Sequence, residues 1–263
     1  MTPPEETGFE HLRWERAGAI ATVYLARPPV NSVSQAMYRE IRRLFADITL
    51  LGAGVKVIIL TGAGRHFCGG NDLQEFATLS AENSEARMSD VRAAFFAVQE
   101  APIPVIAAVH GVALGTGLAL AASCDFVVAA DTARFGTPEI GVGIMGGARH
   151  LARLVPEAWV RWMYLSGDAV SAEQLLRLGG VVAVVPEAEL LTAAHEHAAR
   201  IARHSSALIR MAKRSLDTIE NLPLQQGYTF EQSLTALICA DPDSQEAVRA
   251  TLQRRPPNYP SER

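Results

Sequence analysis

The chain has 263 residues, of which 49% are hydrophobic and 20% charged, and its formal net charge is -4. This length is enough for one α/β domain, or for such a domain with a helical appendage, and the apolar content is enough for a core. A slightly acidic chain without runs of like charge gives no reason to expect nucleic acid or an anionic membrane as a partner.

Apolar runs and amphipathic stretches alternate along the first half of the chain. Residues 9–15 and 19–25 are predicted to be paired strands around the Ala17-Gly18 turn. After a Ser34 cap a helix is expected, since apolar residues recur at three- and four-residue steps: Met37, Ile41, Leu44, Ile48 and Leu51. Continuous apolar runs predict central parallel strands with helices between them: strands at 55–60, 104–109 and 126–129, helices at 92–99 and 117–122. This alternation implies right-handed crossover units and therefore an α/β fold.

The character of the chain changes after Pro156. One short strand is expected at 181–185 and the rest is predicted to be helical, at 171–178, 187–203, 206–220, 225–239 and 244–254. We therefore expect an α/β core over residues 1–195 and a helical module over residues 196–263. Residues 78–90 are polar and irregular, which predicts a mobile lid.

The cysteines and the first residues bear on the compartment. Cys68, Cys124 and Cys239 have no metal-ligand spacing and cannot all pair, which favours a reducing cytoplasm. Residues 1–29 contain no basic flank followed by an apolar run, and the longest apolar stretches are interrupted. We expect a cytoplasmic protein without a signal peptide or a membrane span.

Two glycine-rich turns are the most informative feature of the sequence. They are His66-Phe67-Cys68-Gly69-Gly70-Asn71-Asp72-Leu73 and Gly111-Val112-Ala113-Leu114-Gly115-Thr116-Gly117, and each leaves an apolar strand and is expected to open a helix. Main-chain N–H groups at a helix start are unpaired and lie at the positive end of the helix dipole. Two such ends that converge would hold a negative charge, as an oxyanion hole does.

These turns, read in order with residues 102–111 (PIPVIAAVHG) and 135–140 (FGTPEI), resemble the crotonase superfamily of enoyl-CoA hydratases and isomerases. The resemblance covers roughly residues 10–255. It implies a spiral of ββα units with a C-terminal helical part that packs against neighbouring subunits. It also implies a homo-oligomer, either a trimer or a dimer of trimers, and an acyl-CoA thioester substrate whose coenzyme A makes a separate cofactor unnecessary.

By resemblance, the main-chain N–H groups of Asn71 and Thr116 form the oxyanion hole. The family often has glycine at the position of Thr116, so the threonine side chain would crowd the carbonyl without removing the N–H. Glu139 stands at one of the two acid/base positions of the family. Burial of its carboxyl group beside an acyl chain would raise the pKa toward the range of a general base.

The second acid/base position departs from the hydratase pattern, because Ala119 stands where a typical hydratase has glutamate. Alanine transfers no proton, whereas moving a double bond needs only one base. We therefore expect isomerisation of 3-enoyl-CoA in preference to hydration. Hydration, another crotonase reaction such as dehydration or thioester hydrolysis, and non-catalytic acyl-CoA binding remain open.

Further substrate contacts are expected around the two turns. The candidates are His66, Phe67, Gly70, Asp72, Leu73 and Gly115, with Arg27 and Lys213 for the phosphates of coenzyme A. Asp72 is also expected to cap a short helix at residues 73–76.

Other patterns are set aside or left open. Residues 141–146 match G-x-G-x-x-G, but Pro138 and Glu139 precede them instead of a buried strand, so a dinucleotide site is not expected. His195-Glu196-His197 lacks metal-ligand spacing, so no metal is expected. The segment 143–150 carries Arg149 and His150. His150 would be either an extra proton carrier or, as we favour, a packing or capping group.

Overall fold

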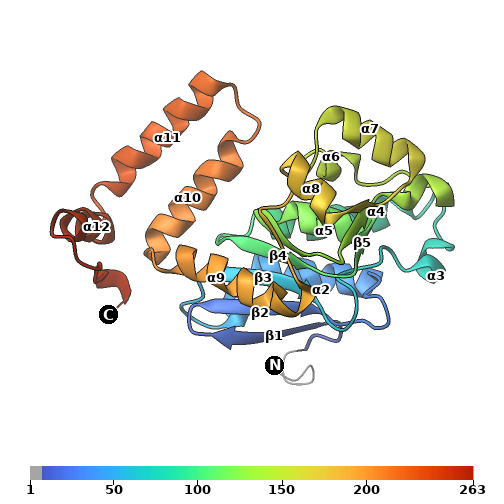
Figure 1. The fold of residues 1–263 in the computed structure, drawn as a ribbon, viewed down its shortest axis with the longest axis horizontal. Helices are drawn as coiled ribbons and strands as arrows, with labels where there is room; N and C mark the ends of the chain where they lie inside the picture. Colours follow the sequence, from blue (N-terminus) through green and yellow to red (C-terminus); the bar gives the residue numbers. More distant parts are fainter. Residues whose placement is uncertain (1–7, 263) are drawn as a thin grey trace.

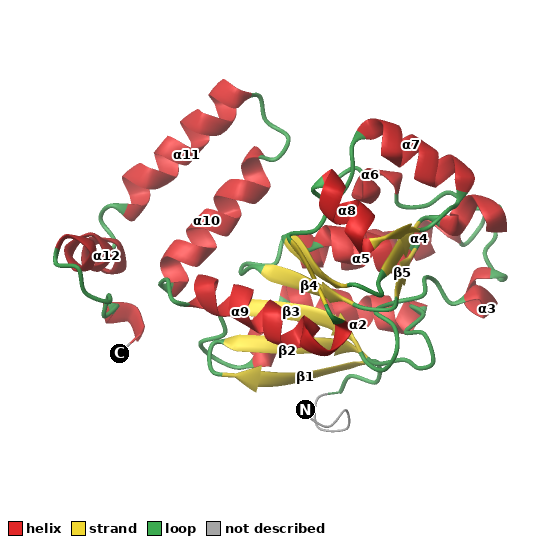
Figure 2. Cartoon of the chain, viewed as in Figure 1, coloured by secondary structure: helices red, strands yellow, loops and turns green. Residues whose placement is uncertain are grey.

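The computed structural model describes residues 8–262. Its strands form two sheets (Figure 2). They are β1 (Leu12–Ala17), β2 (Ile20–Leu25), β3 (Val57–Gly62), β4 (Val105–Val109), β5 (Val112–Leu114), β6 (Phe126–Ala130), β7 (Arg134–Gly136), β8 (Val170–Ser171) and β9 (Ala183–Val185).

The larger sheet has the strand order β1-β2-β3-β4-β6-β9. The hairpin of β1 and β2 is antiparallel and turns at Gly18, whose φ of 61° glycine adopts without strain. Every other pairing in this sheet is parallel. All residues of β3 and β4 are buried, which explains why their sequences are continuous apolar runs. The predicted central strands are confirmed.

The smaller sheet has the order β5-β7-β8 and was not predicted. β5 and β7 are parallel, with Val112 opposite Arg134 and Leu114 opposite Gly136. Strands of two or three residues are too short to show an alternating pattern. Together the two sheets make the mixed α/β fold that was expected.

The helices pack around these sheets. The longer ones are α2 (Gln35–Ala46), α4 (Ser84–Gln99), α5 (Thr116–Ser123), α7 (Glu157–Ser166), α8 (Ala172–Leu178), α9 (Leu190–Ala202), α10 (Ser206–Ile219), α11 (Leu224–Ile238) and α12 (Pro242–Leu252). The short ones are α3 (Leu73–Phe76), α6 (Ala148–Leu151), η1 (Ile48–Leu51), η2 (Pro138–Val142), η3 (Glu187–Glu189) and η4 (Pro260–Glu262). Ser34 caps α2 by accepting from the N–H of Met37, as predicted. α7 was not predicted.

The lid prediction is wrong for the second half of residues 78–90. Helix α4 begins at Ser84 and packs against α2. Met88, Val91 and Phe95 follow one another at spacings of three and four, which place them on one helix face. The polar residues before and between them, such as Glu85, Asp90 and Arg92, concealed this face.

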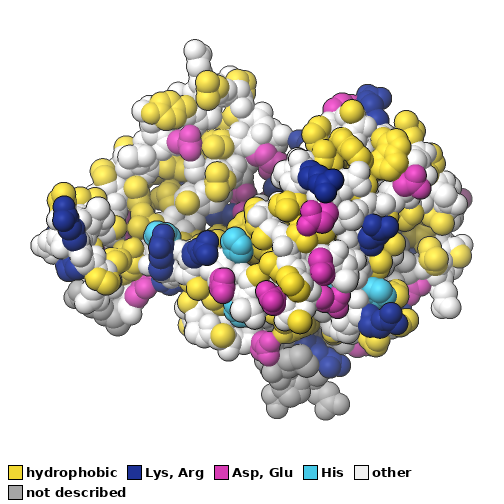
Figure 3. Space-filling view, viewed as in Figure 1, with side chains coloured by type: hydrophobic (Ala, Val, Ile, Leu, Met, Phe, Trp, Pro, Cys, Tyr) yellow, Lys and Arg dark blue, Asp and Glu magenta, His cyan; other side chains and the backbone are white. Residues whose placement is uncertain are grey.

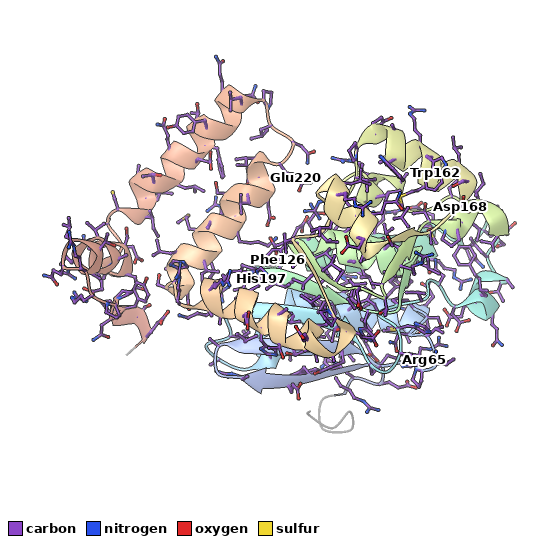
Figure 4. The ribbon with its side chains drawn as sticks, in the orientation of Figure 1. Arg65, Phe126, Trp162, Asp168, His197 and Glu220 are labelled. Atoms are coloured by element: carbon purple, nitrogen blue, oxygen red, sulfur yellow. The ribbon has the colours of Figure 1, made fainter. Side chains whose placement is uncertain are left out.

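The C-terminal helices leave the core (Figure 1). α9 still lies across the large sheet, and its His197 ring contacts the Phe126 ring of β6 at a centroid distance of 5.9 Å (Figure 4). The expected division between residues 195 and 196 therefore falls inside a helix that belongs to the core. α10, α11 and α12 extend away from the sheet (Figures 1 and 2).

A buried lysine joins this arm to the core. The Lys213 ammonium group on α10 donates to the carbonyl of Gln99 and lies 3.2 Å from Asp125 Oδ1 and 2.8 Å from Asp217 Oδ1. Lys213 is only 4% exposed.

Of the helices in the described part of the chain, none combines the length and the apolar character that a membrane crossing requires.

Candidate active site

Three segments far apart in the sequence run side by side at the site. The Phe67 N–H donates to the His110 carbonyl, and the Cys68 N–H donates to the Val112 carbonyl, each at 2.9 Å. β5 in turn pairs with β7, and the Gly115 N–H donates to the Gly136 carbonyl at 2.9 Å. Because the segments are parallel, their carboxyl ends meet at one edge. The residues that follow these ends are Asn71, Thr116 and Glu139.

Glycine lets the two turns approach each other closely. A Cβ on Gly117 would lie 2.2 Å from the Cys68 carbonyl oxygen, so only glycine allows α5 to start against the first turn. Gly70 and Gly115 have φ angles of 114° and 53°, which side chains rarely tolerate. The sequence-based prediction that the two turns lie together is therefore confirmed in the structure.

Two main-chain N–H groups are unused at this edge. Thr116 is the first residue of α5, so its N–H lies at the positive end of the helix. The Asn71 N–H lies between two bonded neighbours, since Val33 donates to Gly70 and Asp72 donates to Val33. Across residues 8–262 neither N–H has a hydrogen-bond acceptor. Both residues line the same cavity, so both donors remain available to a ligand.

A buried tyrosine, which sequence reasoning missed, joins the two residues. The Tyr38 hydroxyl donates to Asn71 Oδ1 at 2.6 Å and lies 2.7 Å from Thr116 Oγ1. Because the tyrosine has one proton, the threonine hydroxyl is the donor in the second contact. Burial raises the pKa of Tyr38, so the phenol stays neutral. Tyr38 lies on the apolar face of α2, where it is indistinguishable from a core residue in the sequence.

The cavity has a volume of about 730 Å³ and a mostly apolar lining. Its walls come from both turns, α4, η2 and the segment before α6. The lining residues are Val30, Ser32, Gly69, Gly70, Asn71, Leu73, Phe76, Met88, Val91, Arg92, Phe95, Leu114, Gly115, Thr116, Ala119, Pro138, Glu139, Val142, Ile144, Met145, Gly146, Gly147, Arg149 and His150. This size and character suit a small organic ligand with an apolar part.

Glu139 is the one carboxylate of this lining, and it lies beside the second turn. A Cβ on Gly115 would be 3.0 Å from Glu139 Oε1, and a Cβ on Gly146 would be 2.2 Å from the same atom. Glu139 Oε2 is buried and has no hydrogen-bond partner among residues 8–262. Burial raises the pKa of this carboxyl group above its ordinary value of 4.5, although the N–H groups of Glu139 and Gly147 act in the opposite direction.

Ala119 leaves an open position on α5, three residues after Thr116. A Cβ on the neighbouring Gly147 would lie 3.3 Å from Ala119 Cβ and 3.7 Å from His150 Nδ1. The His150 ring contacts the Phe95 ring at a centroid distance of 5.0 Å. Burial, together with Arg153 and Arg149, lowers the pKa of His150 below 6.5, so the imidazole is neutral at pH 7.

Of the other predicted contacts, Gly70, Leu73 and Gly115 line the cavity. His66, Phe67, Asp72 and Arg27 are not among the residues that line it. The Arg27 guanidinium is paired with Asp72, which also caps α3 by accepting from the N–H groups of Gln74 and Glu75. Lys213 lies away from the cavity, in the contacts with Gln99, Asp125 and Asp217. Ligand contacts for these five side chains remain predictions.

Burial also decides the state of the nearest cysteine. The Cys68 side chain is fully buried, and burial raises the pKa of its thiol to about 12. A protonated thiol is a poor nucleophile. Cys68 therefore acts as a small packing residue. Across residues 8–262 no cluster of three metal-ligating side chains is present.

Two unused main-chain N–H groups and a partly buried carboxylate therefore line one cavity, and such a set suits a site that holds a negatively charged oxygen while a proton moves nearby. The family model "Enoyl-CoA hydratase/isomerase" matches residues 15–262. The chain belongs to this family, the crotonases.

Individual relatives agree with this family assignment. The chain is 36% identical to 2,3-dehydroadipyl-CoA hydratase of Escherichia coli, over 93% of this chain and 96% of the relative. It is 37% identical to (7aS)-7a-methyl-1,5-dioxo-2,3,5,6,7,7a-hexahydro-1H-indene-carboxyl-CoA hydrolase of Rhodococcus jostii, over 83% of this chain and 87% of the relative. Its fold matches the crystal structure of an enoyl-CoA hydratase from Bacillus anthracis with a TM-score of 0.89 and 31% identity, over 95% and 99%.

Proposed function

We propose that the protein converts an acyl-CoA thioester through an enolate, with Asn71 and Thr116 as oxyanion donors and Glu139 as the group that moves the C2 proton. The observation that carries this proposal is the position of the Glu139 carboxylate beside Gly115, one residue before the free N–H of Thr116. Negative charge on the thioester oxygen would be stabilised by both donors, and loss of one such donor typically costs about 3 kcal/mol in the barrier.

Which overall reaction follows from the enolate, isomerisation or hydration, is a separate question. Ala119 favours isomerisation, because one carboxylate is enough to move a double bond. The similar proteins named above are two hydratases and a hydrolase, and they give no support to that preference. We therefore place enolate formation at the centre of the proposal and treat hydration and isomerisation as its two outcomes.

The experiment is exchange of the C2 protons of a saturated acyl-CoA in D2O, followed by mass spectrometry. We expect exchange by the wild-type protein and a loss of at least about 100-fold in Glu139→Gln, because the amide cannot accept the proton. Glu157→Gln, which removes an exposed carboxylate on α7, is the matched control and should exchange normally. Normal exchange by Glu139→Gln would contradict the proposal.

Parallel assays distinguish the outcomes. Hydration of 2-enoyl-CoA and isomerisation of 3-enoyl-CoA are measured with the same preparations. Binding of acyl-CoA without exchange or turnover would instead indicate a non-catalytic binding protein.

A second candidate is hydrolysis of a bicyclic dioxo acyl-CoA. The Rhodococcus relative is named a hydrolase of a bicyclic dioxo acyl-CoA. The cavity of about 730 Å³ is large enough to admit a fused ring system. A bicyclic 1,5-dioxo acyl-CoA offered as substrate would test this candidate, with the hydrolysis product identified by mass spectrometry.

We further propose that the chain forms a trimer or a dimer of trimers through its C-terminal helices. Large apolar side chains are exposed on this arm, including Leu224 at 86%, Leu252 at 79% and Leu237 at 63%. Figure 3 shows apolar atoms spread over the arm.

The two buried, unpaired cysteines suit a reducing compartment, and we propose the cytoplasm.

A further inference from the structure

We propose that His150 is the second proton-transfer group of this site and takes the part that a carboxylate at the position of Ala119 would play. The inference rests on the proposed enolate chemistry of Glu139 and extends it to the addition of water. It assigns to this chain a residue pair, Glu139 and His150, in place of two carboxylates.

The position of His150 is the first support. His150 and Ala119 border the same residue, Gly147, and both line the cavity that holds Glu139. Gly147 follows Gly146, whose missing side chain leaves room for the Glu139 carboxylate. The carboxylate of Glu139 therefore lies against Gly146, and Ala119 and His150 lie against the next residue, Gly147.

The freedom of the imidazole is the second support. The Phe95 ring packs against His150 from α4. Within residues 8–262 the His150 side chain has no hydrogen bond and no ion pair. A histidine with a capping role would donate to or accept from the chain, so the capping interpretation fails. Both ring nitrogens remain available to a water molecule or a substrate.

The charges around His150 are the third support. Arg149 lies on α6 with His150, Arg153 follows this helix, Arg92 comes from α4, and Glu139 is the carboxylate of the cavity lining. Burial and the two nearest guanidinium groups lower the pKa of His150. The neutral ring at pH 7 can accept a proton, which an imidazolium cannot.

The step balances as follows. The oxygen of a water molecule bonds to C3 of a 2-enoyl-CoA while His150 takes a proton from that water. The electron pair of the C2–C3 double bond moves toward the thioester oxygen, held by the N–H groups of Asn71 and Thr116. Protonated Glu139 then gives its proton to C2, and a proton passes from the imidazolium back to Glu139 through water.

The test compares two reactions in one variant. His150→Phe keeps an aromatic ring against Phe95 and removes the basic nitrogens. We expect C2 exchange, which needs Glu139 alone, to stay within about threefold of wild type, and hydration of 2-enoyl-CoA to fall about 100-fold. Equal hydration rates, or equal losses in hydration and exchange, would overturn the proposal and leave His150 a packing residue.

Chemical rescue gives a readout that packing would not move. In His150→Ala, added imidazole should restore hydration in proportion to its concentration, whereas pyrazole, of the same size but far less basic, should not. Equal rescue by both, or no rescue by imidazole, would overturn the proposal. Failure of the enolate proposal itself would show separately, as normal C2 exchange in Glu139→Gln.

Discussion

Burial raises the pKa of Glu139, so its carboxyl group keeps a proton to a higher pH than a carboxyl group in water does. Because the folded protein raises the pKa of this group, the base is absent below that pKa and present above it. We predict that the rate of C2 exchange rises with pH through a midpoint above 4.5. A pH profile with its midpoint at or below 4.5 would show that the carboxylate is not desolvated in the working enzyme.

The same shift predicts a change in stability. Above its folded pKa, Glu139 is a poorly solvated charge, so the native state is less stable than it would be with a neutral side chain. Glu139→Gln should therefore raise the melting temperature at pH 7. The difference between the two proteins should shrink as the pH falls through the raised folded pKa toward 4.5, and it should vanish below 4.5, where the wild-type carboxyl group is neutral in both states. Thermal unfolding at several pH values measures this.

Gly146 determines where the carboxylate can lie. A Cβ added at this position would overlap Glu139 Oε1, so Gly146→Ala should displace the carboxyl group. We expect the rate of C2 exchange to fall about 100-fold, the effect of a misplacement near 1 Å. Gly141→Ala is the matched control in the same stretch, since nothing lies within 4 Å of its Cβ. Similar exchange rates in the two variants would count against the assigned position of Glu139.

At the scale of elements, the contact between α5 and the first turn builds the oxyanion hole. Gly117→Ala would force these elements apart, and we expect it to reduce the free energy of unfolding by about 2 kcal/mol and to lower activity. Gly227→Ala on α11 meets atoms only at 3.5 Å and beyond, so it should stabilise the protein by about 0.5 kcal/mol. Urea unfolding of both variants measures these opposite signs.

The attachment of α10 depends on Lys213. Lys213→Met would leave the buried Asp125 without its cation, and we expect a loss of about 3 kcal/mol in stability. The KM for acyl-CoA should not change in the fraction that folds, because the ammonium group contacts protein oxygens. A large rise in KM at unchanged stability would restore the prediction that Lys213 binds coenzyme A.

Elements with a clear apolar pattern could be predicted from the sequence. Elements whose apolar side chains face the cavity could not. The runs at 55–60 and 104–109 are buried on both faces, so their sequences identify them. Helix α4 presents Met88, Val91 and Phe95 to a cavity, and the polar residues around them resembled a loop. The glycine turns and Glu139 were found through their motifs, whereas Tyr38 looked like any core residue.

At the scale of the whole molecule, the C-terminal arm exposes several large apolar side chains, among them Leu224, Leu237 and Leu252, and such side chains favour an interface. Light scattering after gel filtration should give three or six times the chain mass of 28.3 kDa. Leu237→Asp combined with Leu252→Asp should lower this mass. A wild-type mass equal to one chain would contradict the proposed assembly.

The whole account depends on where a thioester oxygen binds. A crystal structure with an unreactive enoyl-CoA analogue tests this most directly. We predict that the thioester oxygen lies about 2.7–3.1 Å from the nitrogens of both Asn71 and Thr116, with the Glu139 carboxylate next to C2. A thioester oxygen bound away from these two nitrogens, or a Glu139 side chain turned into solvent, would contradict the account.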